Sequence, residues 1–147
     1  MTYGLMRKAS SMYQQTGARG GVEDADPHQL TAMLLDGVLD RIAQARGHIH
    51  HRDVAAKGIA FSKAQAIIAE LRSSLNHETG GDLSRRLASL YEYVTRRLLQ
   101  AQLNNDLDAL DEAARLLMPI RDSWHAIREG YLAQRSEQAK TTVAASA

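Results

Sequence analysis

The 147-residue sequence contains no cysteine and only two prolines. Without cysteine there can be no disulfide framework, no thiolate metal ligand and no cysteine nucleophile, and such a composition is typical of proteins from a reducing compartment. The sequence also lacks an apolar run of the roughly 18 residues that a membrane helix needs. Its N-terminal segment has no apolar core of the kind found in secretory signals. We therefore expect a cytoplasmic protein without a membrane span.

A large excess of one charge is also missing. The 18 lysines and arginines are nearly balanced by 17 aspartates and glutamates, which gives a formal net charge of +1. A nucleic-acid-binding domain is expected to have a basic excess or a clustered basic patch, so we expect no nucleic-acid partner. The pairs Arg85–Arg86 and Arg96–Arg97 are interpreted as a solvated helix face, with an acidic or mixed-charge protein partner as the alternative.

The alternation typical of strands is absent, whereas apolar residues recur at helical spacing in four segments. We expect helices from about Pro27 to Ile49, from Val54 to Leu75, from Asp82 to Leu103, and from Asp106 to Tyr131 or beyond. Helices of this length with short connections favour antiparallel neighbours. The sequence therefore predicts an all-α fold, an antiparallel up-down four-helix bundle. Pro119 lies inside the last segment, where it should kink the helix.

Capping residues and glycines separate these segments. Asp26 precedes a proline in the first turn, and Asp53, Asp82 and Asp106 are the expected caps of the other three helices. Gly80-Gly81 supplies the left-handed or turn conformations that end a helical pattern.

The two ends of the chain are polar and lack a continuous apolar stripe. We expect residues 1–22 to form a mobile or conditionally ordered segment, residues 23–135 to form the bundle, and residues 136–147 to form a disordered tail.

No arrangement of residues typical of catalysis or cofactor binding is present. The sequence contains no phosphate-binding loop, no dinucleotide-binding motif and no defensible Ser/His/Asp order. The histidines His48, His50 and His51 are interpreted as solvated residues near a helix end. Asp122-x-x-His125 occurs once, whereas a di-iron bundle site needs two such motifs and two further carboxylates. We expect no enzymatic activity, no metal and no cofactor.

The first helix has more apolar surface than a single-sided helix requires. An amphipathic helix buries a stripe about 100° wide, whereas the apolar residues here cover roughly half of the circumference. One interpretation is deep burial in the bundle. The other is a groove for the amphipathic segment of a partner. The residues concerned are Leu30, Leu34, Leu35, Val38, Leu39 and Ile42.

Two further features weakly favour a groove. One side of the second helix carries mostly small residues, which allow another backbone to approach closely. The N-terminal segment contains Met12 and Tyr13, which could lie in such a groove until a partner arrives. The small side is formed by Ala55, Ile59, Ser62, Ala66, Ala69 and Ser73.

Several strings are more specific than these patterns. From about Val22 to Ile127, the chain contains PHQLTAMLLDG, SKAQAII, GGDL, LYEY, RRLLQA and a late Trp124, in that order. Together they resemble the FliS family of flagellar secretion chaperones. The resemblance implies an antiparallel four-helix bundle with an extra N-terminal segment that can cap a groove.

The same resemblance implies a function without catalysis. Members of the family bind the disordered C-terminal region of flagellin in the cytoplasm and prevent its premature polymerisation. They then deliver it to the flagellar type III export gate, where the cytoplasmic domain of FlhA is the docking platform. The alternative is a helical adaptor or regulator that binds another cytosolic flagellar protein, such as an anti-sigma factor.

The resemblance also favours the groove interpretation for part of the surplus apolar surface. We assign to the core Leu30, Leu34, Ile67, Leu90, Val94 and Trp124. Tyr13 matches the N-terminal tyrosine of the family. The expected partner-binding residues are Met12, Tyr13, Leu35, Leu39, Ile59, Ala66 and Ala69.

Overall fold

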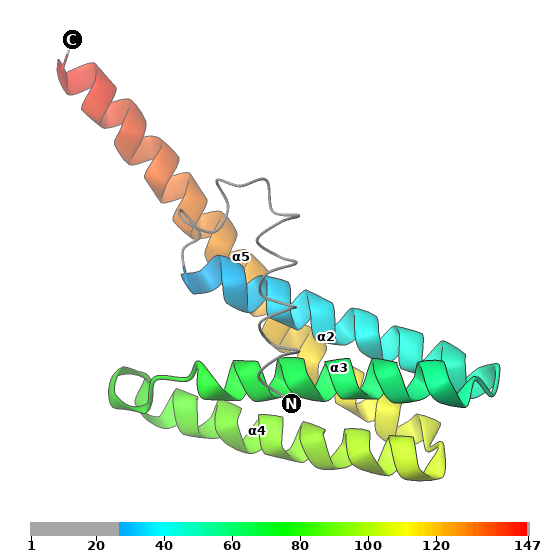
Figure 1. The fold of residues 1–147 in the computed structure, drawn as a ribbon. Helices are drawn as coiled ribbons and strands as arrows, with labels where there is room; N and C mark the ends of the chain where they lie inside the picture. Colours follow the sequence, from blue (N-terminus) through cyan, green and yellow to red (C-terminus); the bar gives the residue numbers. More distant parts are fainter. Residues whose placement is uncertain (1–26, 147) are drawn as a thin grey trace.

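Four helices account for nearly all of the part of the chain that the computed structural model describes, residues 27–146 (Figure 1). They are α2 (Pro27–His50), α3 (Val54–Ser73), α4 (His77–Asn104) and α5 (Leu107–Ser146). No strand occurs among the described residues. The all-α prediction is confirmed.

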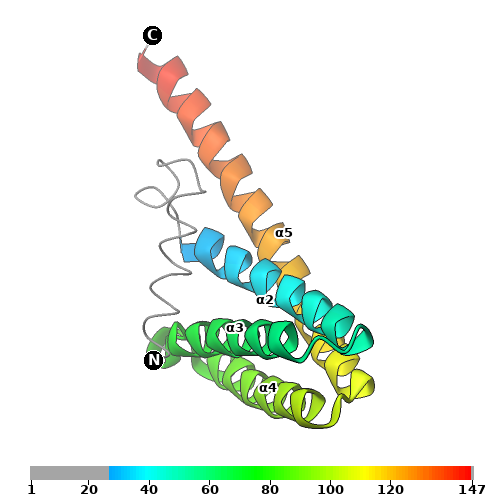
Figure 2. The ribbon, with the colours of Figure 1, turned by 45° about the vertical axis from the view of Figure 1, so that its right-hand side comes forward.

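The helices pack as a ring of neighbours. α2 contacts α3 and α5, and α4 contacts the same two helices, whereas the backbones of the diagonal pairs in residues 27–146 do not approach each other. Figures 1 and 2 show that the first part of α5 lies against the bundle and that its C-terminal half projects beyond it. This arrangement confirms the predicted up-down bundle.

A single apolar core lies between the four helices. Complete burial of a large apolar side chain contributes roughly 1.5–3 kcal/mol, so about ten such side chains together contribute roughly 15–30 kcal/mol. The largest fully buried side chains are Tyr91, Phe61, Leu35, Ile68, Leu71, Leu98, Leu110, Leu117, Val38 and Val94.

The wide apolar arc of α2 is explained by its position between two neighbours. Because α2 packs against both α3 and α5, a broad sector of its circumference is buried. Leu35 is 0% exposed and Leu39 is 8% exposed, and both belong to the core. The expectation that these two leucines form a free surface is therefore wrong, and burial is the correct interpretation.

The residues predicted to be in the core fall into three groups. Leu34, Ile67 and Val94 are buried as expected, and Leu90 and Trp124 are partly buried against the core. Leu30, in contrast, is 43% exposed, because it lies outside the sector of α2 that faces its neighbours.

Local sequence signals fix most helix ends. Asp53 Oδ1 accepts the backbone N–H of Ala56 at 3.1 Å, and Asp106 Oδ1 accepts that of Ala109 at 3.1 Å, which confirms both caps. The side-chain carboxylate of Asp106 is stabilised by the Ala109 N–H and by Gln100, so its pKa is lowered. The predicted cap Asp26 lies outside the described residues.

The start of α4 differs from the prediction. The helix begins at His77 because the Asn76 side chain accepts the N–H groups of Glu78 and Thr79 at 3.1 and 3.2 Å. The expected break occurs within it, at Gly81, where φ is 52° and ψ is −128°. This left-handed φ favours glycine, as expected for the Gly80-Gly81 pair.

The end of α5 also differs from the prediction. The helix continues through Pro119 and extends to Ser146, into the segment expected to be a disordered tail. From Leu132 to Ala145 every residue is exposed, so burial does not stabilise this part. Its alanine, glutamine, glutamate and lysine residues have high helix propensity, which accounts for a helical conformation without packing.

Removal of this unpacked part should leave the bundle intact. Deleting residues 136–147 is expected to change the free energy of unfolding by less than about 0.5 kcal/mol, because residues 136–145, whose side chains the structure describes, are all exposed. Urea titrations followed by circular dichroism measure the effect. A deletion that starts at Trp124 is the control and should destabilise the bundle, because Trp124 packs on the core. A loss above about 1 kcal/mol in the shorter deletion would reveal a packing role for the segment.

Candidate partner-binding face

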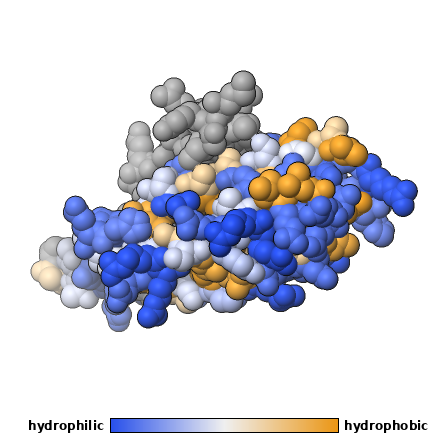
Figure 3. Space-filling model, turned by 90° about the horizontal axis from the view of Figure 1, so that it is seen from below, coloured by the Kyte–Doolittle hydropathy of each residue, from blue (hydrophilic) through white to orange (hydrophobic). Residues whose placement is uncertain are grey.

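Four exposed apolar side chains project from neighbouring parts of α3 and α4. They are Val54 and Ile59 near the start of α3, and Leu99 and Leu103 near the end of α4. We call them the α3–α4 face. Figure 3 shows a mostly hydrophilic surface whose larger apolar areas lie in its right-hand half, toward the end of the bundle where α3 begins and α4 ends. Clustered exposed apolar side chains are a property of interaction sites.

Hydrogen bonds between α3 and α4 bring these residues to one side of the bundle. Lys57 Nζ donates to the carbonyl oxygen of Gln102 at 3.3 Å, and Gln65 Nε2 donates to that of Thr95 at 3.0 Å. Leu99 lies one helical turn after Thr95, on the side of α4 that is next to α3. Val54, Leu99 and Leu103 therefore lie along one antiparallel seam, whereas Ile59, five residues after Val54, lies about 140° from it around α3, on the outer side of that helix.

Small residues lie along the α3 side of this seam. A Cβ atom added to Gly58 would meet no other atom within 4 Å, so the space above this position is open. Ser62 and Ala69 are exposed and lie on nearly the same helical direction as Gly58, at 100° per residue. This strip allows the backbone of another chain to approach α3 between Ile59 and the seam.

The structure separates the residues expected to bind a partner. Ile59 is 57% exposed on the α3–α4 face, and Ala69 is also exposed there. Ala66 is only 8% exposed, so it does not form part of the accessible strip. Leu35 and Leu39 are core residues, as described above. The other two, Met12 and Tyr13, lie outside the described residues.

The sequence patterns missed Val54, Leu99 and Leu103. One signal was available on α4: Leu99 and Leu103 are four residues apart, so they share a face of the helix. This face is distinct from the stripe that contains Tyr91 and Leu98, both of which are buried.

Arginine side chains border the apolar residues on α4. Arg96 is exposed one turn before Leu99, and its guanidinium carbon lies 5.9 Å from the centre of the Tyr93 ring. Arg85 and Arg86 are exposed nearer the start of the helix, where Arg85 pairs with Asp82. These three arginines therefore have the exposure expected of a solvated helix face.

The fourth arginine, Arg97, belongs to a network between α4 and α5. It pairs with Glu112 at 2.9 Å, and the Tyr93 hydroxyl donates to the same carboxylate at 2.5 Å. This hydrogen bond raises the pKa of Tyr93 and lowers the pKa of Glu112, because it favours the neutral phenol and the charged carboxylate. The neighbouring Tyr91 is buried, and burial raises its pKa to about 12. Both tyrosines are therefore neutral at physiological pH.

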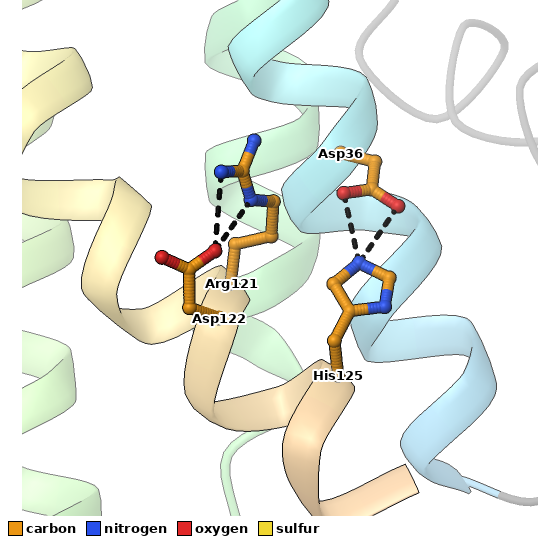
Figure 4. A network of polar contacts seen from close by, with 4 residues as sticks. All are labelled: Asp36, Arg121, Asp122 and His125. Atoms are coloured by element: carbon orange, nitrogen blue, oxygen red, sulfur yellow. Dashed lines mark hydrogen bonds and ion pairs between the residues drawn. The ribbon is translucent and has the colours of Figure 1, made fainter. Parts of the chain in front are cut away.

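The contact between α2 and α5 contains His125, the histidine of the single Asp122-x-x-His125 motif. His125 Nε2 lies 3.0 Å from both carboxylate oxygens of Asp36, while Asp122 pairs with Arg121 at 3.1 Å (Figure 4). The motif residues Asp122 and His125 thus have different partners. The described residues contain no group of three or more histidine, aspartate or glutamate side chains placed to hold a metal ion. Nearer the C-terminal end of α2, an ion pair between Arg46 and Asp111, at 2.6 Å, also joins α2 to α5.

Among the helices of residues 27–146, none is both long enough and apolar enough to cross a membrane.

Comparisons with known proteins place this fold in a family. Residues 9–131 match the sequence profile described as "Flagellar protein FliS". The chain is 42% identical over 120 residues to the flagellar secretion chaperone FliSB of Pseudomonas aeruginosa, a match that covers 82% of this chain and 95% of that protein. It is 43% identical over 116 residues to the flagellar secretion chaperone FliS of Salmonella typhimurium, covering 78% and 86% of the two chains.

A solved structure supports the same fold. The crystal structure of a bacterial flagellar chaperone superimposes with a TM-score of 0.67 at 16% sequence identity, and the match covers 84% of this chain and 98% of that one. At this identity the likeness concerns the fold alone. The family itself is established by the profile match and by the two relatives, and the chain therefore belongs to the FliS family of flagellar proteins.

Proposed function

We propose that this protein is a cytoplasmic export chaperone for flagellin. In this proposal it binds the disordered C-terminal region of flagellin, prevents premature polymerisation and delivers the complex to the flagellar type III export gate through the cytoplasmic domain of FlhA. Support comes from the relatives, which are named flagellar secretion chaperones. The observation that carries the proposal is the exposed apolar α3–α4 face.

The face suits a client segment that folds on binding. An amphipathic helix can place its apolar side chains against Ile59, Leu99 and Leu103, with its backbone close to the small residues of α3. Ordering a disordered segment costs conformational entropy, which the buried apolar area must offset. A bound client segment is then unavailable for pairing with other flagellin molecules, and the extent of protection follows from mass action.

The proposed client-binding residues are therefore Val54, Ile59, Ala69, Leu99 and Leu103. Ile59 and Ala69 are retained from the residues expected from the sequence. The buried residues Leu35, Leu39 and Ala66 are no longer included. Met12 and Tyr13 keep their proposed roles in capping the groove and in docking. No catalytic role is proposed for the chain.

The proposal predicts a complex of one chaperone with one flagellin molecule. Isothermal titration of the purified full-length protein with its cognate flagellin should give a stoichiometry near one. Far-UV circular dichroism should show more helix than the sum of the separate proteins, because the client segment becomes ordered.

Flagellin that lacks its C-terminal segment is the matched control. Unchanged affinity for this truncated flagellin would contradict the proposed client segment. A pull-down from flagellated cells tests the alternative function. Flagellin should dominate the eluate, whereas recovery of another flagellar protein without flagellin would favour an adaptor or regulator.

A further inference from the structure

One lysine joins the two halves of the α3–α4 face. Lys57 Nζ donates to Asn105 Oδ1 at 2.9 Å as well as to the carbonyl oxygen of Gln102 at 3.3 Å. Asn105 is the C-cap of α4 and has a left-handed backbone conformation, with φ 50° and ψ 41°. A cation at this position also interacts favourably with the negative end of the helix dipole. Lys57 thus binds the C-terminal end of α4 from the first turn of α3.

The chain itself does not connect α3 and α4 at this end. Their connection, residues 74–76, is at the opposite end, where α3 stops and α4 starts. At the end with the apolar face, α3 follows the turn from α2 and α4 leads into α5. The separation of Val54 from Leu103 therefore depends on packing and on noncovalent contacts.

Other polar contacts between α3 and α4 lie farther from this end. Gln65 binds the carbonyl oxygen of Thr95, and Arg72 pairs with Glu92 at 2.5 Å. In the described part of the chain, the hydrogen bonds of Lys57 are the polar link between these helices that is nearest to Val54 and Leu103.

We propose that Lys57 is a positioning residue for client binding, an inference that rests on the proposed function of the α3–α4 face. Lys57 holds the end of α4 at a fixed position relative to α3, so that apolar residues from the two helices are ready to receive one amphipathic helix. A binding surface that is already ordered loses less conformational freedom on association, and its affinity is correspondingly higher.

The variant Lys57→Met tests this inference, because it keeps an unbranched apolar stem and removes the ammonium group. We expect its dissociation constant for a fluorescent peptide from the C-terminal segment of cognate flagellin to rise about threefold to tenfold. Fluorescence anisotropy measures the constant at a temperature where urea titrations show both proteins to be folded. Under this condition a loss of stability alone does not change the affinity.

Matched variants distinguish positioning from charge. Lys63→Met removes the same charge from the same helix and should bind as tightly as the wild type. Lys57→Arg retains a cation with donors and should recover part of the lost affinity. Asn105→Gly removes the acceptor of the Lys57 hydrogen bond, and glycine tolerates the left-handed backbone. As a single variant it should weaken client binding, but in combination with Lys57→Met it should cause little further loss of affinity.

Four outcomes would overturn the inference. Wild-type affinity in Lys57→Met, or equal losses in Lys57→Met and Lys63→Met, would show that the link does not position the face. Fully additive effects of Lys57→Met and Asn105→Gly would show that the two residues act separately. If the wild type itself fails to bind the peptide, the proposed function fails together with the inference.

Discussion

Replacing Leu35 with alanine is expected to lower the free energy of unfolding by about 2–5 kcal/mol. Leu35 is 0% exposed and lies in the core at the centre of α2, a helix that packs against both α3 and α5. Truncation removes buried methyl groups and leaves a cavity that two fixed neighbours cannot fill. Urea titrations followed by far-UV circular dichroism measure the loss.

Leu30→Ala is the matched control for this prediction. It makes the same chemical change in the same helix at a side chain that is 43% exposed, and it should cost less than about 1 kcal/mol. Similar losses in the two variants would contradict the orientation of α2. If Leu35→Ala had wild-type stability, Leu35 would have to lie at the surface, as the sequence interpretation proposed.

The comparison of these two leucines shows what a single-helix pattern can predict. The spacing of apolar residues correctly indicated where helices occur, because period and capping are local properties. It did not indicate which sector of α2 faces α3 and α5, because this depends on the neighbours. Leu30 and Leu35 are about 140° apart at 100° per residue, so a wrong choice of sector exchanges their environments.

The α3–α4 face was only half predictable for a related reason. Ile59 and Ala69 belong to one helix, and the small residues around them are apparent from its periodicity. Leu99 and Leu103 lie far away in the sequence and join Ile59 only through the register of two antiparallel helices. This register is visible in contacts such as that between Lys57 and Gln102, which no local pattern contains.

The C-terminal part of α5 illustrates a different limit. Among the described residues, those that pack on the core end with Trp124, before residue 135, where the sequence predicts that the bundle ends. Helical conformation continues to Ser146, because local propensity and burial are separate contributions. The loss of an apolar stripe therefore predicts exposure more directly than it predicts disorder.

The largest expected effect on client binding comes from α4. Leu103 is 72% exposed and Leu99 is half exposed, so neither contributes much to the core. If the client helix covers them, each contributes apolar burial to the complex but little to the stability of the free chaperone. A carboxylate at either position would be solvated in the free protein and would lose water on binding, without a partner in the complex.

The double variant Leu99→Asp/Leu103→Asp is therefore expected to weaken flagellin binding at least about thirtyfold, while its free energy of unfolding stays within about 1 kcal/mol of the wild type. Isothermal titration with cognate flagellin and urea titration measure the two quantities. Leu83→Asp is the control, because Leu83 is exposed on the same helix near its opposite end, and it should bind as the wild type does. Unchanged affinity in the double variant would remove the α3–α4 face from the client site, whereas a collapse of stability would assign these leucines to the core.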